Sequence, residues 1–316
     1  MQITGTFIDE ISHDIPHQNW GPKEWDIDFA HMKKMGIDTV ILIRCGYHQF
    51  LTYPSKYLIE KHQRFRPPID LVKLFLELSE KYGMTFYFGT YDSGKYWETG
   101  DMRHEIEVNL PVIEEVYQTY GHYKSFGGWY LSLELSRKTK GAVESIAQLG
   151  SHCKAVSGGL PVLISPWIDG KKAIAATEGQ LMKSSGISLT EHEKEWNEIF
   201  DGIKNSIDIV AFQDGHVGFN ELEDYLKVNN ALAEKYGLQS WTNSESFDRD
   251  MPIKFLPIKW EKLLFKLEAA KRAECEKAIT FEFSHFMSPQ SAYVQAGHLY
   301  NRYMESHLAP KGGTKI

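Results

Sequence analysis

The sequence predicts a closed barrel of eight parallel strands, each followed by a helix, on the basis of three observations. Short runs of β-branched and aromatic residues alternate eight times with stretches in a helical pattern. The helical stretches commonly end at a glycine just before the next run, as in the usual connection from helix to strand. The loops after the strands are longer than those before them, which is typical of an elaborated carboxyl-terminal face. We therefore expect one α/β domain, a (β/α)8 TIM barrel with long loops at that face, over residues 1–308, and a disordered tail over 309–316.

The individual strands are expected where apolar residues concentrate. The second run, from Thr39 to Arg44, is almost continuously apolar, as expected for a parallel strand that is covered on both faces. The expected strands cover residues 2–9, 39–44, 85–89, 126–134, 161–165, 209–212, 238–245 and 278–283. A doubly wound sheet is the alternative, but eight units of even length without a glycine-rich phosphate turn favour the barrel.

The helices follow from the helical spacing of apolar residues between the strands. They are expected at residues 25–34, 69–82, 102–120, 141–156, 190–205, 219–236, 257–275 and 291–306. Five of them stop at a glycine, a residue that ends helices readily because it adopts the left-handed conformation. These glycines are Gly36, Gly83, Gly121, Gly158 and Gly237.

Composition and charge exclude several classes of function. Hydrophobic residues make up 42% and charged residues 24%, as in an ordinary globular protein. The net charge of −7 is spread along the chain without a Lys/Arg-rich tract, so we expect no nucleic-acid partner. No apolar run approaches the roughly 18 residues of a membrane span. No signal peptide is recognisable, which leaves a cytoplasmic protein or a mature periplasmic or extracellular form whose leader was removed.

Two glutamates at predicted strand ends carry the functional prediction. Glu134 ends the fourth strand and Glu245 ends the seventh. The carboxyl ends of barrel strands surround one common site. Retaining glycosidases place two carboxyl groups about 5–5.5 Å apart, and inverting ones about 6.5–9.5 Å apart. We predict a glycoside hydrolase with Glu134 as the acid/base and Glu245 as the nucleophile, although the sequence does not choose between the two spacings.

Each glutamate also has a structural interpretation. Strand alternation places Glu134 on the inward face with Tyr130, where it could form an ion pair with Arg44 or Arg137. Glu245 could instead be an exposed acid in a loop. Two other functions stay open on these grounds: a carbohydrate-binding barrel without catalysis, and a metal-dependent hydrolase.

Further polar and aromatic residues at strand ends are expected to bind the carbohydrate. Several have structural alternatives, since an aspartate can cap a turn and an arginine can pair with a neighbouring acid. Glu282 is in addition a substitute for either catalytic glutamate. The predicted substrate-binding residues are Asp9, Arg44, Tyr91, Asp92, Trp167, Gln213, Asp214, Trp241, Asn243 and Glu282.

A metal site is the weaker hypothesis. His13 and His17, with Asp14 between them, could supply two imidazoles and a carboxylate after the first strand. The His-x-His pattern that many metal-dependent barrel hydrolases carry on strand one is replaced by Phe7-Ile8-Asp9. We therefore expect no metal and no cofactor.

Several segments spread along the chain carry a resemblance to a known family: residues 5–9, 19–21 with Trp25, 35–40, 91–97, 128–131, 211–215, 281–283 and 287–289. They resemble a bacterial family catalogued as domain of unknown function 4434, common in Bacteroides-type bacteria. The resemblance implies a glycoside-hydrolase-like TIM barrel that acts on a carbohydrate. The two acids are also similar to those of the clan-A retaining glycosidases, although that clan usually has Asn where this chain has Leu133.

Overall fold

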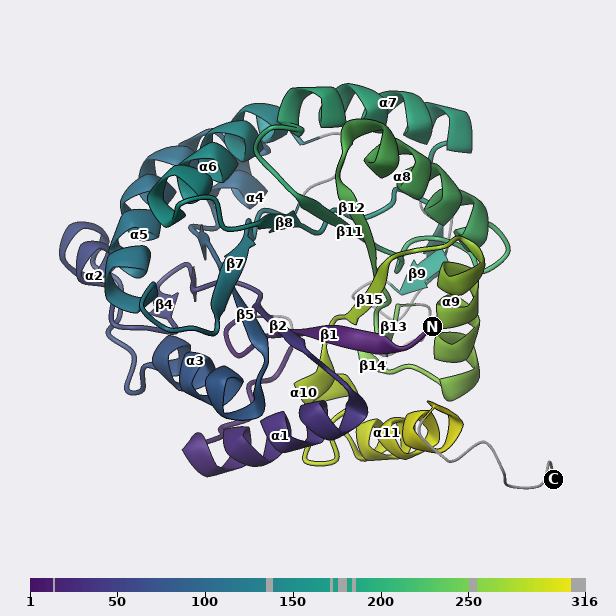
Figure 1. The fold of residues 1–316 in the computed structure, drawn as a ribbon, viewed down its shortest axis with the longest axis horizontal. Helices are drawn as coiled ribbons and strands as arrows, with labels where there is room; N and C mark the ends of the chain where they lie inside the picture. Colours follow the sequence, from purple (N-terminus) through teal and green to yellow (C-terminus); the bar gives the residue numbers. More distant parts are fainter. Residues whose placement is uncertain are drawn as a thin grey trace.

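The computed structural model describes residues 1–13, 15–134, 139–170, 173–175, 181–183, 186–249 and 255–307. Eight parallel strands form a closed barrel in the order β1-β2-β5-β7-β8-β11-β12-β15, and β15 pairs with β1 to close it. Figure 1 shows the helices as an outer ring around these strands. The predicted (β/α)8 fold is therefore confirmed. The predicted tail at 309–316 lies outside the described residues.

The barrel strands follow one another around the cylinder in sequence order, so that each pairs with its neighbours along the chain. They are β1 (Ile3–Ile8), β2 (Thr39–Leu42), β5 (Thr85–Gly89), β7 (Phe126–Tyr130), β8 (Val162–Ile164), β11 (Ile209–Gln213), β12 (Gln239–Asn243) and β15 (Lys277–Thr280). The helices of the outer ring are α1 (Pro22–Met35), α3 (Leu71–Tyr82), α5 (His104–Tyr120), α6 (Ala142–Ser157), α7 (Leu189–Ile203), α8 (Leu222–Tyr236), α9 (Trp260–Arg272) and α11 (Val294–His307).

The loops after the strands contain short elements of their own. A three-stranded sheet joins the loops after β2 and β5, and two antiparallel hairpins follow β8 and β12. The long loops predicted at this face are thus partly ordered structure. These elements are β3 (Gly46–Tyr47), β4 (Phe50–Leu51), α2 (Lys56–His62), β6 (Tyr91–Asp92), α4 (Lys95–Thr99), β9 (Ala173–Ala175), β10 (Leu181–Lys183), β13 (Phe247–Asp248), β14 (Leu256–Pro257) and α10 (Phe283–Phe286).

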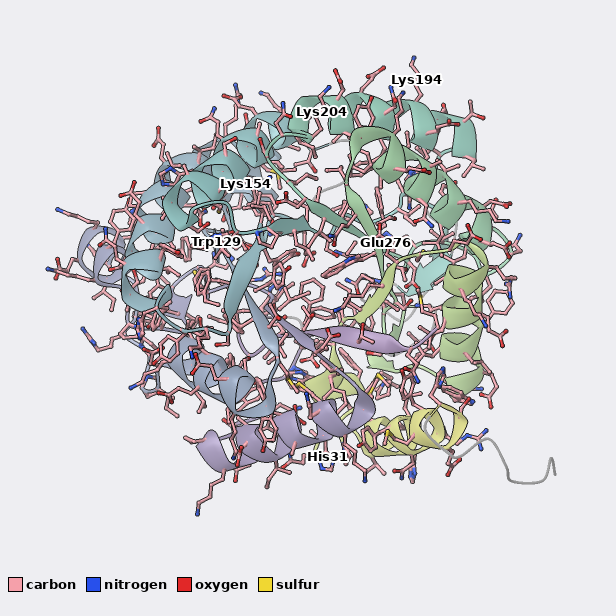
Figure 2. All side chains as sticks on the ribbon, viewed as in Figure 1. His31, Trp129, Lys154, Lys194, Lys204 and Glu276 are labelled. Atoms are coloured by element: carbon pink, nitrogen blue, oxygen red, sulfur yellow. The ribbon has the colours of Figure 1, made fainter. Side chains whose placement is uncertain are left out.

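The apolar core has an inner and an outer layer because side chains alternate across each strand. In β2, Val40 and Leu42 pack outward with the helices, while Ile41 packs inside the barrel. Trp129 belongs to the outer layer, and its indole N–H donates to the Ser157 hydroxyl of α6 at 3.1 Å. Figure 2 shows Trp129 between the strands and the outer helices. The inner layer fills the barrel with Phe7, Ile41, Ile43, Tyr87, Tyr130, Leu163, Ile209, Ala211, Trp241 and Ile279.

The glycines at helix ends act in two ways. Gly36 and Gly83 end α1 and α3 with φ of 96° and 62°, the left-handed conformation that a side chain disfavours. Gly121 ends α5 with φ of −61°, so its backbone is not left-handed. A Cβ there would lie 2.5 Å from the Tyr117 carbonyl oxygen. Close packing, and not backbone conformation, therefore favours glycine at position 121.

Several strands end earlier than predicted, and three of these were expected to carry glutamates of the site near their ends. The prediction ran to residues 134, 245 and 283, but β7, β12 and β15 end at Tyr130, Asn243 and Thr280. The Leu131 N–H still donates to the Leu163 carbonyl oxygen at 3.0 Å, but the next N–H, that of Ser132, donates to the Thr90 hydroxyl at 3.0 Å, so a side chain replaces the backbone partner there. Both predicted catalytic glutamates are consequently loop residues.

Candidate active site

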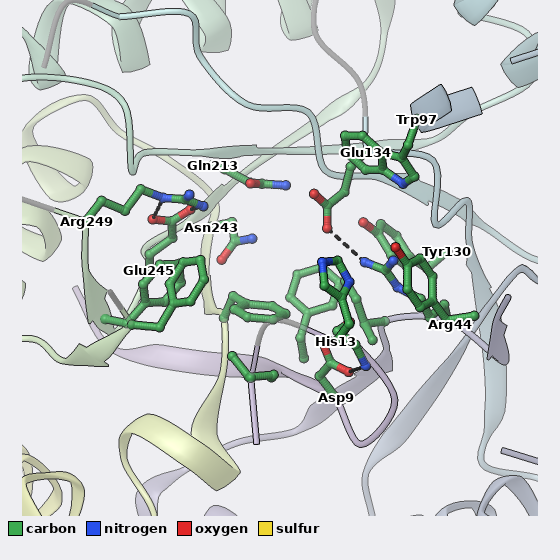
Figure 3. A pocket seen from close by; sticks show the side chains of 18 residues that line it. Asp9, His13, Arg44, Trp97, Tyr130, Glu134, Gln213, Asn243, Glu245 and Arg249 are labelled. Atoms are coloured by element: carbon green, nitrogen blue, oxygen red, sulfur yellow. Dashed lines mark hydrogen bonds and ion pairs between the residues drawn. The ribbon is translucent and has the colours of Figure 1, made fainter. Parts of the chain in front are cut away.

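A cavity of about 470 Å³ lies among the loops that follow the barrel strands. Its wall contains both predicted catalytic glutamates, which Figure 3 shows on opposite sides of the hollow. The lining residues come from the ends of β1, β2, β7, β11, β12 and β15, from the loops beyond these strands, and from the loop beyond β5. They are Phe7, Asp9, Ser12, His13, Ile15, Ile43, Arg44, Tyr47, Trp97, Tyr130, Glu134, Gln213, Asn243, Glu245, Phe247, Arg249, Phe255 and Phe281.

Glu134 lies at the rim of this cavity and contacts a buried arginine. Its side chain is 28% exposed, and its Oε1 accepts from Arg44 Nη2 at 3.0 Å. Arg44 Nη1 donates to Asp92 Oδ2 at 2.9 Å. Burial would by itself lower the pKa of Arg44, but the carboxylates of Glu134, Asp92 and Asp9 raise it above its usual value, so the guanidinium stays charged. The predicted pair with Arg44 is present, and Arg137 lies outside the described residues.

Glu245 is held much more tightly than Glu134. It is buried, and both carboxylate oxygens accept from Arg249: Oε2 from Nε and Oε1 from Nη2, each at 2.8 Å. Burial would by itself raise the pKa of Glu245, but the charge and hydrogen bonds of Arg249, with a contribution from Lys266, lower it below its ordinary value. Glu245 is therefore a carboxylate at neutral pH.

Asp214 supports Glu245 from behind the cavity wall. Its Oδ1 accepts from the Glu245 backbone N–H at 3.2 Å and from Lys266 Nζ at 2.7 Å. Lys266 also donates to the Glu245 carbonyl oxygen at 3.0 Å. Burial, opposed by Lys266, raises the pKa of Asp214. This buried pair fixes the backbone from which the Glu245 side chain projects.

Buried polar atoms with unused hydrogen-bonding capacity line the floor of the cavity. In the described part of the chain, Asp9 Oδ2, the Tyr130 hydroxyl and Asn243 Oδ1 have no hydrogen-bond partner. The other Asp9 oxygen accepts from two backbone N–H groups of its loop, and Asn243 Nδ2 donates to Ser165 Oγ at 3.2 Å. Buried polar groups are nearly always paired, so three unpaired atoms around one hollow indicate a place for a polar ligand.

The structure brings six of the predicted site residues to the cavity wall. They are Asp9, Arg44, Glu134, Gln213, Asn243 and Glu245. The six others, Tyr91, Asp92, Trp167, Asp214, Trp241 and Glu282, are not among the lining residues.

The predicted site residues that do not line the cavity make packing contacts, hydrogen bonds or ion pairs elsewhere in the barrel and its loops. Trp241 packs in the barrel interior, with its ring 6.3 Å from that of Tyr87. The Tyr91 hydroxyl accepts from Arg64 Nε at 2.7 Å. Trp167 forms a backbone bridge to Gln213. Glu282 is the N-cap residue of α10 and pairs with His285.

Several lining residues were missed by the sequence analysis, and Arg249 is the most important. It lies four residues after Glu245, just beyond β13, and its guanidinium lies 4.9 Å from the Phe247 ring centroid. The sequence shows a glutamate and an arginine four residues apart. This spacing predicts an ion pair only if the loop after β12 brings the two side chains together, as it does in the structure. Tyr130, which strand alternation places on the inward face, and Trp97, within the segment 91–97 that carries the family resemblance, also line the cavity.

The histidines of the metal hypothesis do not form a cluster. His13 lines the cavity with its ring 5.3 Å from that of Tyr47, His17 is exposed, and Asp14 lies outside the described residues. Within the described ranges, no group of three or more His, Cys, Asp or Glu side chains is placed to hold a metal ion. Among the same residues, no helix is both long and apolar enough to cross a membrane.

The closed barrel of eight parallel strands with its outer ring of helices defines a (β/α)8 TIM barrel, and one cavity beyond its strand ends contains two glutamates. The chain belongs to the family described as domain of unknown function 4434, whose model matches residues 3–293. The resemblance inferred from the sequence is thereby confirmed. No curated protein matches the chain.

Solved structures similar to this one include glycoside hydrolases. A protein from Bacteroides thetaiotaomicron, named a "putative alpha-L-fucosidase", is 63% identical with a TM-score of 0.91, over 96% of this chain and 92% of that one. An endo-1,4-beta-D-mannanase from Thermotoga petrophila is 11% identical with a TM-score of 0.55, over 89% and 87% of the two chains. An intracellular xylanase from Thermoanaerobacterium saccharolyticum is 11% identical with a TM-score of 0.51, over 88% and 84%. The last two share only the fold.

Proposed function

We propose that this protein hydrolyses a glycosidic bond by a retaining mechanism, with Glu134 as acid/base and Glu245 as nucleophile. The observation that carries the proposal is that both carboxylates line one cavity whose floor has unpaired polar atoms. The name of the relative that is 63% identical makes a terminal α-L-fucosyl residue the first substrate to test. The substrate is thus a carbohydrate.

The proposed reaction has two steps. In the first, a Glu245 oxygen attacks the anomeric carbon while Glu134 gives its proton to the departing oxygen, so that an ester links the sugar to Glu245. In the second, Glu134 takes a proton from water, the water oxygen bonds to the anomeric carbon, and Glu245 leaves as a carboxylate. The free sugar keeps its anomeric configuration.

The surroundings of the two acids suit these roles. The nucleophile must be ionised, and Arg249 keeps the pKa of Glu245 low despite its burial. A carboxylate offers about four acceptor positions, and the fork of Arg249 occupies two, so others stay open to the anomeric carbon. Glu134 is partly exposed at the rim, where its proton can exchange with water between the two steps.

Covalent trapping tests the roles of both glutamates. A 2-deoxy-2-fluoro-α-L-fucosyl fluoride, with matching galactosyl, glucosyl and mannosyl fluorides, should leave a sugar on Glu245, which peptide mass spectrometry would locate. Glu245→Ala should not be labelled, whereas Glu261→Gln, an exposed change on α9, should be labelled as in the unchanged protein. A label on another carboxylate would contradict the assignment.

A carbohydrate-binding barrel without catalysis is the second candidate. It is favoured by the Arg249 fork, which covers Glu245 and weakens it as a nucleophile. Calorimetric binding of a glycan, with no product released on prolonged incubation, would support this candidate over hydrolysis.

A further inference from the structure

The floor and the mouth of the cavity have different chemistry, and the difference gives a direction to the bound substrate. Asp9, Tyr130 and Asn243 are almost fully buried, and within the described chain each has one side-chain atom without a partner. Trp97 lines the same cavity, yet its side chain stays 47% exposed. The floor can accept or donate hydrogen bonds to hydroxyl groups, while the mouth offers a flat apolar surface.

Trp97 is held at the same end of the cavity as Glu134. It lies on α4, and its indole N–H donates to Asp92 Oδ2 at 3.2 Å. The same Asp92 oxygen accepts from Arg44, whose other nitrogen holds Glu134. Figure 3 shows Trp97 and Glu134 on one side and the Glu245–Arg249 pair on the other.

The proposed chemistry requires the leaving group to lie beside the acid. Glu134 gives its proton to the leaving oxygen, so whatever is attached to that oxygen must extend from the Glu134 side of the cavity. An indole held there can stack against the C–H face of a sugar ring, because an aromatic ring combines a large apolar face with a fixed orientation. One side of this indole already contacts the Tyr96 ring, with the centroids 4.6 Å apart.

We propose that Trp97 is the binding platform for the leaving group, so that the substrate is a glycoside whose leaving group is itself a sugar ring. The sugar that is transferred to Glu245 occupies the polar floor formed by Asp9, Tyr130 and Asn243. This inference rests on the proposed function and adds the substrate class and the orientation. Trp97 is a specificity-determining residue in this scheme and takes no part in bond breaking.

A structural role of Trp97 makes a different prediction. Its hydrogen bond to Asp92 could position Arg44 and, through it, Glu134. Trp97→Phe removes that hydrogen bond but keeps an aromatic face, whereas Trp97→Ala removes both. Phe65→Ala is a matched control, because Phe65 is also an exposed aromatic residue, packs against Phe50 and is not a lining residue.

The experiment compares two kinds of leaving group on the same transferred sugar. Fucosyl, galactosyl, glucosyl and mannosyl fluorides of both anomers identify that sugar, since fluoride leaves without a ring to stack. A disaccharide with the same sugar at its non-reducing end then supplies the ring. We expect Trp97→Ala to lower kcat/KM for the disaccharide about tenfold or more, and for the fluoride by less than about twofold. Trp97→Phe and Phe65→Ala should keep most of the activity on both substrates.

The other outcomes contradict the inference in distinct ways. An equal loss on both substrates, in the Phe variant as well as the Ala variant, would show that Trp97 acts through Asp92. No loss on either substrate would show that the leaving group does not touch the indole. If the unchanged protein turns over none of the fluorides or disaccharides, the proposed function itself is wrong, and the leaving-group role falls with it.

Discussion

Glu134 and Glu245 are the same residue type and both lie just beyond a barrel strand, β7 and β12, yet their surroundings differ. Glu134 lies at the rim and shares Arg44 with Asp92. Glu245 is buried under the fork of an arginine from its own loop, and its backbone is tied to Asp214 and Lys266. Glu134 is thus partly open to solvent beside an arginine that it shares, whereas Glu245 is shielded from solvent and held as a carboxylate. The barrel brings both glutamates to one cavity, but the loops determine how exposed each carboxylate is and with which arginine it pairs.

The largest expected effects come from removing each carboxylate. Glu245→Ala should abolish turnover of every substrate, because the nucleophile is needed for good and poor leaving groups alike. Glu134→Ala should lower kcat by about 10²–10⁴ on a disaccharide, as for the loss of a general acid, and less on a glycosyl fluoride, which needs no proton to leave. Steady-state kinetics and azide rescue would measure both. Equal losses on both substrates in Glu134→Ala would remove the contrast between the two acids.

Arg249→Met tests why Glu245 stays ionised. Without the fork, burial should raise the pKa of Glu245, so the acidic limb of kcat/KM should move to higher pH. Leaving a largely buried charge unpaired should also cost about 3 kcal/mol of folding free energy.

The pH dependence of stability gives an independent check on the same pair. The lowered pKa of Glu245 stabilises the fold above the ordinary carboxyl pKa, and this contribution is lost as the pH falls below it. Urea unfolding would measure the free energy of unfolding of Arg249→Met and of the unchanged protein at pH 7 and pH 4. The difference between the two proteins should be smaller at pH 4 than at pH 7. The same difference in unfolding free energy at both pH values, with no change in the acidic limb of the kcat/KM profile, would contradict this account.

Gly215→Ala disturbs the same pair without removing a charge. A Cβ at Gly215 would lie 2.0 Å from Glu245 Oε2 and 2.4 Å from Arg249 Nε, so the pair must shift. We expect kcat/KM to fall about tenfold and stability to fall by about 1–3 kcal/mol, as for an overpacked site. Gly218→Ala is the matched control, because its Cβ would come within 3 Å only of the Asn220 side-chain oxygen. Equal behaviour of the two variants would mean that the Glu245 geometry is not critical.

A third acid, Glu282, should have the smallest effect on chemistry. It follows β15 but pairs with His285 and is not a lining residue. We expect Glu282→Gln to keep kcat within about tenfold of the unchanged protein. The substitution can only shift neighbouring residues, and such a shift costs less than the loss of a general acid. A loss as large as that of Glu245→Ala would make Glu282 a catalytic residue.

The stability effect of this variant should depend on pH. Burial would by itself lower the pKa of His285, but the charge and hydrogen bond of Glu282 raise it to about 9. The pair therefore stabilises the fold fully below the ordinary histidine pKa, and this contribution is lost as the pH rises through about 9. The difference in Tm between Glu282→Gln and the unchanged protein should shrink from pH 6 to pH 10. A difference independent of pH would contradict the pairing.

The sequence by itself determined the barrel and the neighbourhood of its site. Apolar runs such as 39–42 and helix-ending glycines such as Gly36 act locally, so the order of elements could be read from the chain, and closure then places residues 134 and 245 at one end. Tertiary structure alone decided where β7 stops, because the bond between Ser132 and Thr90 joins the loops that follow β7 and β5. It also decided that Arg249 covers Glu245, that Trp241 packs inside the barrel, and that Trp97 and Glu134 share one end of the cavity. The physical reason is that hydrogen bonds and ion pairs between loops depend on distances in space, which the spacing of residues along the chain does not contain.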